Sequence, residues 1–359
     1  MYSPRASTVA KSLLSRASRH LLTPDPSELP EMSTALDRSL DWSMGQGRHG
    51  DAFEPTYSET RGSALGFQVE PGGEQASASD KTELSTEATR AVIAADMGRE
   101  AARWFDARTE PFRTRQLSWA GGFGANFSTA LDGNGVVEAS ATYGWTPGMT
   151  GQFPDTIVQM VRIAQQALPA LEPFYTTIRC GRSAGGQQIT FELTQDTSFA
   201  DLAPLMEAFG LSHRHAGLTT LGAFSLGARY TLPARSTTLT LLRSGPQIEL
   251  RLDINLDALP DAPQVLLPLL RLPMAERPGA LASFDRWLTA LTPEGYGGPG
   301  SVNVLSIRVR SDMPARIAVY LRPVSFDEGE RQAPQTPEMH AAAAGEFRAA
   351  DMPDWRAYR

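Results

Sequence analysis

The sequence predicts an α+β fold in which a closed antiparallel β-barrel of about ten strands is surrounded by α-helices. Two observations lead to this prediction. Pairs of segments with alternating apolar and polar residues are joined by tight turns, which connect antiparallel strands. Helical segments separate these pairs along the chain. A single antiparallel sheet of this many strands tends to curl and close, and the helices would then cover its outside.

The most regular strand pair lies at residues 301–324, where one face is apolar and the other is polar. The polar face carries Arg308, Arg310, Arg316, Tyr320 and Arg322. If helices cover the barrel, the apolar face points outward and the polar face lines a lumen that could hold an anion. The same alternation at residues 247–254 places Arg251 on the inner face. The alternative is an open sheet whose arginine face is simply solvated.

The chain divides into four segments by composition. Residues 1–24 contain apolar residues every four positions, which predicts an amphipathic helix that either packs on the domain or acts as a transit peptide. Residues 25–84 are rich in Pro, Gly, Ser and acidic residues and are expected to be largely irregular or disordered. The barrel domain is predicted at residues 85–326, followed by a flexible C-terminal tail at residues 327–359.

Within the barrel domain, periodicity predicts helices and strands in alternating groups. Helices are expected at residues 86–107, 155–168, 199–209, 262–271 and 279–291. Strands are expected at residues 115–129, 136–145, 174–180, 188–193, 219–230, 236–243 and 247–254, followed by the pair at 301–324.

Composition excludes several classes of protein. The net charge of −7 and the pI of about 5.4 argue against a general nucleic-acid-binding protein. The single cysteine, Cys180, cannot form an intramolecular disulfide and fits a reducing cytoplasm. No apolar run approaches the roughly 20 residues of a membrane span. We therefore expect a cytoplasmic monomer that has no membrane span and does not bind nucleic acid.

The order of elements at residues 85–326 resembles the ABBA prenyltransferases, whose PT barrels are built from α-β-β-α units, and in particular the dimethylallyltryptophan synthases. Arg115–Trp119 resembles the first barrel strand of that branch. ARIAVYLRP at residues 315–323 resembles its closing strand, with a tyrosine near the end and a proline after it. Gln116 stands where the branch has an acidic residue, and several cationic positions are replaced. The resemblance is therefore that of a divergent member.

The resemblance implies a transferase of secondary metabolism. It would move an allylic prenyl group from a donor such as dimethylallyl diphosphate to an aromatic or other nucleophilic acceptor, a small molecule or a peptide, through a carbocation-like transition state. The implied diphosphate-binding residues are Arg179, Arg251, Arg308, Arg316, Tyr320 and Arg322. The candidate proton acceptors are Glu138 and Glu192, and the aromatic residues expected to shield the cation and the acceptor are Trp119, Tyr143 and Trp145.

Each of these residues also has a plain structural interpretation, as a solvated strand residue or as core packing. No cofactor is expected to be required, and a Mg²⁺ site is not indicated, because clustered aspartates are absent from the sequence. His213 and His215 lack further metal ligands nearby. Two alternatives to an enzyme stay open: a non-catalytic barrel that binds a hydrophobic or anionic ligand, and a protein-interaction domain.

Overall fold

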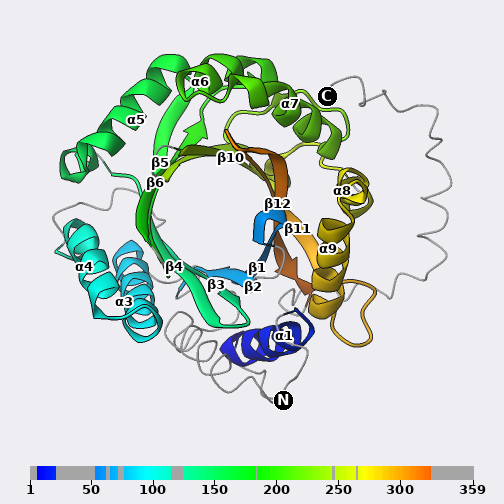
Figure 1. Cartoon of the computed structure of the whole chain (residues 1–359), viewed down its shortest axis with the longest axis horizontal. Helices are drawn as coiled ribbons and strands as arrows, with labels where there is room; N and C mark the ends of the chain where they lie inside the picture. Colours follow the sequence, from blue (N-terminus) through cyan, green and yellow to red (C-terminus); the bar gives the residue numbers. More distant parts are fainter. Residues whose placement is uncertain are drawn as a thin grey trace.

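The computed structural model shows a closed antiparallel barrel with an outer ring of helices (Figure 1). It describes residues 6–21, 53–61, 65–71, 77–114, 124–146, 148–182, 184–244, 247–263 and 266–324. The strands follow the order β1-β12-β11-β10-β9-β6-β5-β4-β3-β2 around the barrel, and β1 pairs with β2 to close it. The predicted fold class is confirmed.

The barrel strands pair as hairpins along the chain. They are β1 (Phe53–Ser58), β2 (Leu65–Val69), β3 (Ala125–Asp132), β4 (Gly135–Gly144), β5 (Leu171–Gly181), β6 (Gly185–Leu193), β9 (Thr237–Ser244), β10 (Gln247–Asn255), β11 (Gly300–Arg310) and β12 (Met313–Pro323). Each hairpin, such as β3–β4 or β11–β12, reverses at the same end of the barrel, which we call the turn end. At the opposite end, the link end, longer connections carry the chain from one hairpin to the next. A separate short pair, β7 (Thr197–Ser198) and β8 (Thr231–Leu232), lies outside the barrel.

The helices belong to these longer connections. They are α1 (Ala6–Leu21), α3 (Ala78–Asp96), α4 (Arg99–Arg113), α5 (Asp155–Ala167), α6 (Ala203–Ala208), α7 (His215–Ser225), α8 (Leu266–Ala275) and α9 (Pro278–Leu291). Figure 1 shows them surrounding the barrel. Among the described helices, none is long and apolar enough to cross a membrane.

The apolar core lies between the outer face of the sheet and the helices. On β10, Leu250, Leu252 and Ile254 are fully buried, whereas the residues between them line the lumen. Tyr57 of β1 packs against Phe284 and Trp287 of α9, with ring centroids 5.0 and 5.7 Å apart. Burial of such a side chain contributes about 1.5–3 kcal/mol. The alternation therefore places apolar residues outward and polar residues inward, as predicted.

Several elements differ from the prediction. Strands β1 and β2 lie within the segment expected to be irregular, because Pro55 and Gly66 interrupt their apolar pattern. Gly66 is needed there, since the side chain of Thr56 on β1 occupies the space of a Cβ atom. The predicted helix at residues 86–107 is two helices, which separate at Gly98 with φ of 91°.

The predicted strand at residues 219–230 is wrong, because its first part belongs to helix α7. Thr219 and Thr220 favour a strand by local propensity, but Gly222 of the helix packs directly against the ring of Phe199. This tertiary contact outweighs the local propensity. The predicted strand at residues 115–129 begins late: β3 starts at Ala125, and residues 115–123 lie outside the described part of the chain. The C-terminal segment 327–359 lies outside it as well.

The N-terminal helix α1 packs on the barrel domain. Leu14 and Ala17 are fully buried, and α1 contacts α9 and β2. Arg16 donates from Nε to the carbonyl oxygen of Ala290 at the end of α9, at 3.2 Å. The structure therefore shows the contacts expected of a helix that packs on the domain, the first of the two interpretations of residues 1–24.

Candidate functional site

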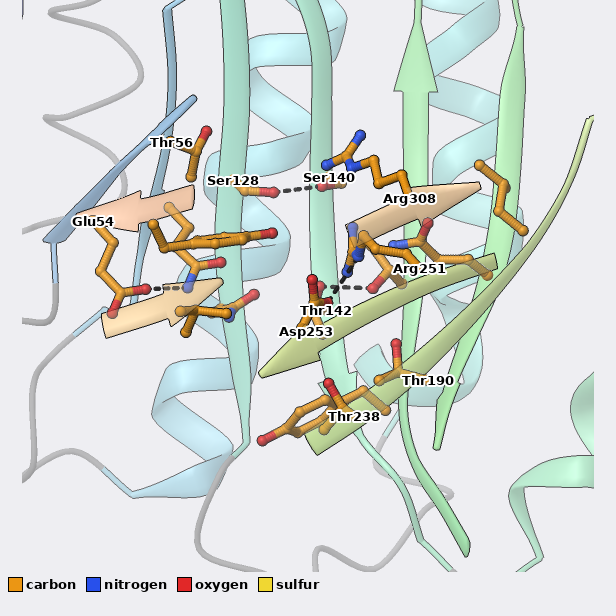
Figure 2. A pocket seen from close by; sticks show the side chains of 18 of the residues that line it. Glu54, Thr56, Ser128, Ser140, Thr142, Thr190, Thr238, Arg251, Asp253 and Arg308 are labelled. Atoms are coloured by element: carbon orange, nitrogen blue, oxygen red, sulfur yellow. Dashed lines mark hydrogen bonds and ion pairs between the residues drawn. The ribbon is translucent and has the colours of Figure 1, made fainter. Parts of the chain in front are cut away.

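A cavity of about 860 Å³ occupies the lumen of the barrel (Figure 2). All of the barrel strands contribute side chains to its wall, and most of these side chains are polar. The volume falls within the range of pockets that hold small organic ligands. The lumen is therefore wide enough for a substrate and is the candidate active site.

Two arginines face each other in register on neighbouring strands of this wall. Arg251 on β10 lies directly opposite Arg308 on β11. Like charges in such cross-strand positions destabilise a sheet, so their presence suggests an anionic partner. Arg251 donates from Nε to Asp253 at 2.8 Å. Burial acts to lower the pKa of Arg251, but Asp253, Tyr320 and Glu249 outweigh it, so the pKa is raised and the guanidinium stays charged.

Tyr320 on β12 lies close enough to these arginines to interact with their charges. Burial raises the pKa of its phenol, and Arg251 and Arg308 oppose this shift. The hydroxyl therefore keeps its proton at neutral pH and can donate a hydrogen bond to an anion beside the arginines.

Every described arginine that lines the cavity also has a carboxylate neighbour. The pairs are Arg179–Glu138 at 2.8 Å, Arg235–Glu192 at 3.9 Å, Arg251–Asp253 at 2.8 Å, Arg308–Glu249 at 4.0 Å, Arg310–Asp312 at 2.9 Å and Arg322–Asp257 at 2.7 Å. An anionic ligand must therefore compete with these carboxylates or loosen the pairs.

Glu54 on β1 is held by two neutral amides on different strands. Gln68 lies opposite it in register on β2 and donates to Oε2, and Asn303 on β11 donates to Oε1. Asn303 reaches the lumen because the register shifts between Val302 and Val304, a β-bulge that redirects the side chain. The surrounding wall removes solvent, and this burial raises the pKa of Glu54. A carboxylate held in this way is suited to accept a proton.

The wall from β3 to β9 is uncharged for much of its area. Hydroxyl pairs link neighbouring strands there: Ser128 with Ser140 at 2.7 Å, and Thr142 with Thr177 at 2.8 Å. Figure 2 shows Ser128 and Ser140 together, and it shows Glu54 well separated from Arg251 and Arg308. The lumen thus contains distinct cationic, acidic and hydroxyl-lined regions.

Most of the predicted site residues line this cavity. They are Arg179, Arg251, Arg308, Tyr320, Arg322, Glu138 and Glu192. The structure therefore brings together residues from β4, β5, β6, β10, β11 and β12. Their roles in binding or catalysis stay predictions.

Arg316 is placed differently from the prediction. It is not among the cavity-lining residues, and its Nε lies 3.9 Å from Glu59. Glu59, in the turn between β1 and β2, also accepts two hydrogen bonds from Arg277, at 2.9 and 3.0 Å, and one from the backbone N–H of Ile317 at 3.0 Å. Arg316 thus belongs to a polar cluster that ties β12 to the β1–β2 turn and to α9.

The predicted aromatic shield is not supported by the structure. Tyr143 points out of the barrel, where its hydroxyl bonds to Thr86 at 2.9 Å and its ring stacks on Phe112 at 4.0 Å. Trp145 packs edge-on against Phe153 at 5.5 Å. Both therefore stabilise the contact between barrel and helices, which explains their apolar surroundings. Trp119 lies outside the described residues. The aromatic residues that line the cavity are Phe67, Phe174, Tyr175 and Tyr320.

Sequence reasoning missed Glu54, Gln68 and Asn303. The first two lie in the segment expected to be irregular. Asn303 is misplaced by simple alternation because the bulge changes its direction. The weak signal was the alternation in Leu65–Val69, which continues to Glu70. Among the described residues, no group of three or more His, Cys, Asp or Glu side chains is arranged to hold a metal ion.

The barrel has the fold of the ABBA prenyltransferases. The chain superposes on 5-dimethylallyltryptophan synthase from Streptomyces coelicolor with a TM-score of 0.64 and 14% identity, over 91% of this chain and 99% of that one. On 6-dimethylallyltryptophan synthase from Micromonospora olivasterospora, in complex with DMASPP and Trp, it superposes with a TM-score of 0.66 and 12% identity, over 89% of this chain and 97% of that one. On AnaPT from Neosartorya fischeri it superposes with a TM-score of 0.62 and 11% identity, over 91% of this chain and 96% of that one. No protein-family model matches the sequence, and no curated protein matches it.

Proposed function

We propose that this protein transfers an allylic prenyl group from its diphosphate to an aromatic or other nucleophilic acceptor in the barrel lumen. The observation that carries the proposal is the in-register pair Arg251 and Arg308 in the substrate-sized lumen of a closed barrel. The shared fold supports it, since similar structures are those of dimethylallyltryptophan synthases, one of them with DMASPP and Trp bound. The acceptor class, aromatic small molecule or peptide, belongs to the same proposal.

The donor is expected to bind with its diphosphate against Arg251 and Arg308, with Tyr320 donating from its hydroxyl. Guanidinium groups suit phosphate oxygens because they donate two parallel hydrogen bonds. The bond between the allylic carbon and the diphosphate oxygen breaks, and its electron pair leaves with the diphosphate. Positive groups that already face the oxygen stabilise the charge that develops there.

The nucleophilic atom of the acceptor then forms a bond to the allylic carbon, and the acceptor loses one proton. Glu54 is the residue that we assign to take this proton. Its carboxylate lines the cavity, its hydrogen-bond partners are neutral, and its raised pKa makes it a stronger base than an exposed glutamate. The ring of Tyr320 also lines the lumen and can face the allylic cation.

The test is release of diphosphate from dimethylallyl diphosphate in the presence of an acceptor panel that includes tryptophan and tryptophan- or tyrosine-containing peptides. Product formation should be detected by mass as the acceptor plus one prenyl group. The variant Arg251→Gln should lose most of this activity. Arg271→Gln, which removes an exposed arginine on α8 outside the lumen, is the matched control. Absence of product with every acceptor and donor length would refute the proposal.

One observation favours a second candidate, a barrel that binds a ligand without catalysis. All described lumen arginines are already paired with carboxylates, which reduces the net positive charge available to a diphosphate. This candidate predicts protection against thermal unfolding by an isoprenoid diphosphate without release of diphosphate. The enzyme predicts both.

A further inference from the structure

The two ends of the lumen differ in charge. The charged residues lining the turn end are Arg179, Arg308, Arg310, Glu138 and Glu249. Those lining the link end are Glu54, Glu70, Glu192, Asp257, Arg235 and Arg322. When the ion-pair partners Asp312 and Lys81 are included, cations and carboxylates balance at the turn end, whereas carboxylates are in excess at the link end, among the described residues. A positively charged group of a ligand would therefore be drawn to the link end.

Among the link-end acids that form an ion pair, Glu192 is the one with the weakest neutralisation by its cation. Arg235 lies 3.9 Å away, and its side chain is 76% exposed, so solvent screens the interaction. By contrast, Asp257 is paired with Arg322 at 2.7 Å, and Glu70 contacts the buried Lys81. Glu192 is therefore the ion-paired acid whose cation a ligand can replace most easily.

Aromatic rings lie beside these carboxylates. Phe174 and Tyr175 both line the cavity, with ring centroids 4.1 Å apart. Burial raises the pKa of Tyr175, and Glu70 and then Glu192 raise it further, so the phenol stays neutral and lies within the field of both acids. Aromatic faces combined with carboxylates suit an organic cation.

An independent observation is that one buried hydrogen-bond acceptor at the link end has no described donor. Asn303 lines the cavity and is only 6% exposed. Its Nδ2 is used by Glu54, but its Oδ1 has no hydrogen-bond partner among the described residues. Leaving a buried acceptor in this state is unfavourable, so a ligand that donates here gains affinity.

We propose that the link end of the lumen binds an acceptor through a positively charged amine, with Glu192 as its main counter-charge and the rings of Phe174 and Tyr175 beside it. This specificity rests on the proposed function, which supplies the donor at the arginine pair. Glu54 keeps its separate role toward the reacting atom of the acceptor. The acceptor is therefore an aromatic ammonium compound, and an aromatic carboxylate is disfavoured.

The experiment is isothermal titration of the wild-type protein with three indole probes that differ in side-chain charge: tryptamine, 3-methylindole and indole-3-propionate. Tryptamine should bind about tenfold more tightly than 3-methylindole, because it adds a charge-assisted contact, and indole-3-propionate should bind most weakly. Equal binding of the three probes, or tighter binding of the carboxylate, would overturn the inference.

A pair of variants tests the residue. Glu192→Gln should remove most of the preference for tryptamine over 3-methylindole. Glu172→Gln makes the same change at the residue opposite Glu192 on β5, which is exposed and does not line the cavity, and should keep the preference. An unchanged preference in Glu192→Gln would refute the assignment.

These readouts are separate from catalysis. A preference for tryptamine without any diphosphate release would leave the amine site standing and remove the proposed function. Diphosphate release with no charge preference among the acceptors would leave the proposed function standing and remove the amine site.

Discussion

Replacing Glu54 by glutamine is expected to abolish most of the transferase activity while leaving the fold and the donor site intact. The carboxylate is the proposed proton acceptor, and glutamine cannot take a proton at neutral pH. Loss of a positioned general base typically lowers a rate by about 10²–10⁴-fold. The loss should appear in kcat, because Glu54 lies apart from Arg251 and Arg308, where the diphosphate is expected to bind (Figure 2).

The structure indicates that the variant will fold. Gln68 and Asn303 donate to different oxygens of the present carboxylate, and an amide at position 54 has an oxygen at only one of these two places. Asn303 can rotate its amide and offer Oδ1, which has no described partner, to the new N–H group. Because burial raises the pKa of Glu54, the ionised side chain is unfavourable in the fold, and glutamine should increase the free energy of unfolding at neutral pH.

The assay is product formation with saturating dimethylallyl diphosphate and the best acceptor, together with thermal unfolding and titration of the donor. Glu172→Gln serves as the control for loss of one negative charge. If Glu54→Gln retains wild-type kcat with a folded, donor-binding protein, Glu54 is not the base, and the argument from its burial and its amide partners fails.

Three further predictions follow from individual contacts. In the wild-type protein, activity should rise with pH through the raised pKa of Glu54. The free energy of unfolding should fall as pH rises above the ordinary pKa of 4.5, since the folded state holds this proton more tightly than the unfolded state. The same pH dependence in Glu54→Gln would contradict this. Glu59→Gln should lower the free energy of unfolding in urea by about 2–3 kcal/mol. This is less than for a fully buried ion pair, because Arg277 is partly exposed. A loss below about 0.5 kcal/mol, typical of surface substitutions, would contradict a stabilising role of Glu59. Leu14→Ala should cost about 2–5 kcal/mol, whereas the exposed Ser12→Ala should change little; equal melting temperatures would mean that α1 does not stabilise the domain.

The fold could be predicted because alternation in hairpins such as β11–β12 is local information. Apolar residues at every second position define one buried face, and the tight turn fixes antiparallel pairing. The same argument placed Arg251 and Arg308 inside the barrel. Their direct apposition, however, depends on the register between β10 and β11, which lie 45 residues apart in sequence and are joined by helices α8 and α9.

The rest of the site depended on features that alternation does not record. Glu54 lies in a short strand containing a proline, and the pairing of that strand, β1, with β12 is a long-range contact. Asn303 faces the lumen only because of a bulge. Tyr143 and Trp145 carry the residue types expected of a shield, but the alternation of β4 turns Tyr143 toward α3 and α4, and Trp145, just after β4, packs against the segment before α5.

The measurement that tests the central claim most directly is calorimetric titration of dimethylallyl diphosphate into the wild-type protein and into Arg251→Gln and Arg271→Gln. We expect saturable binding of one donor per chain. It should weaken about ten- to hundredfold in Arg251→Gln, because a charge-assisted hydrogen bond is lost, and should not change in Arg271→Gln. Absence of binding to the wild type, or equal affinity in all three proteins, would contradict the assignment of the arginine pair as the diphosphate site.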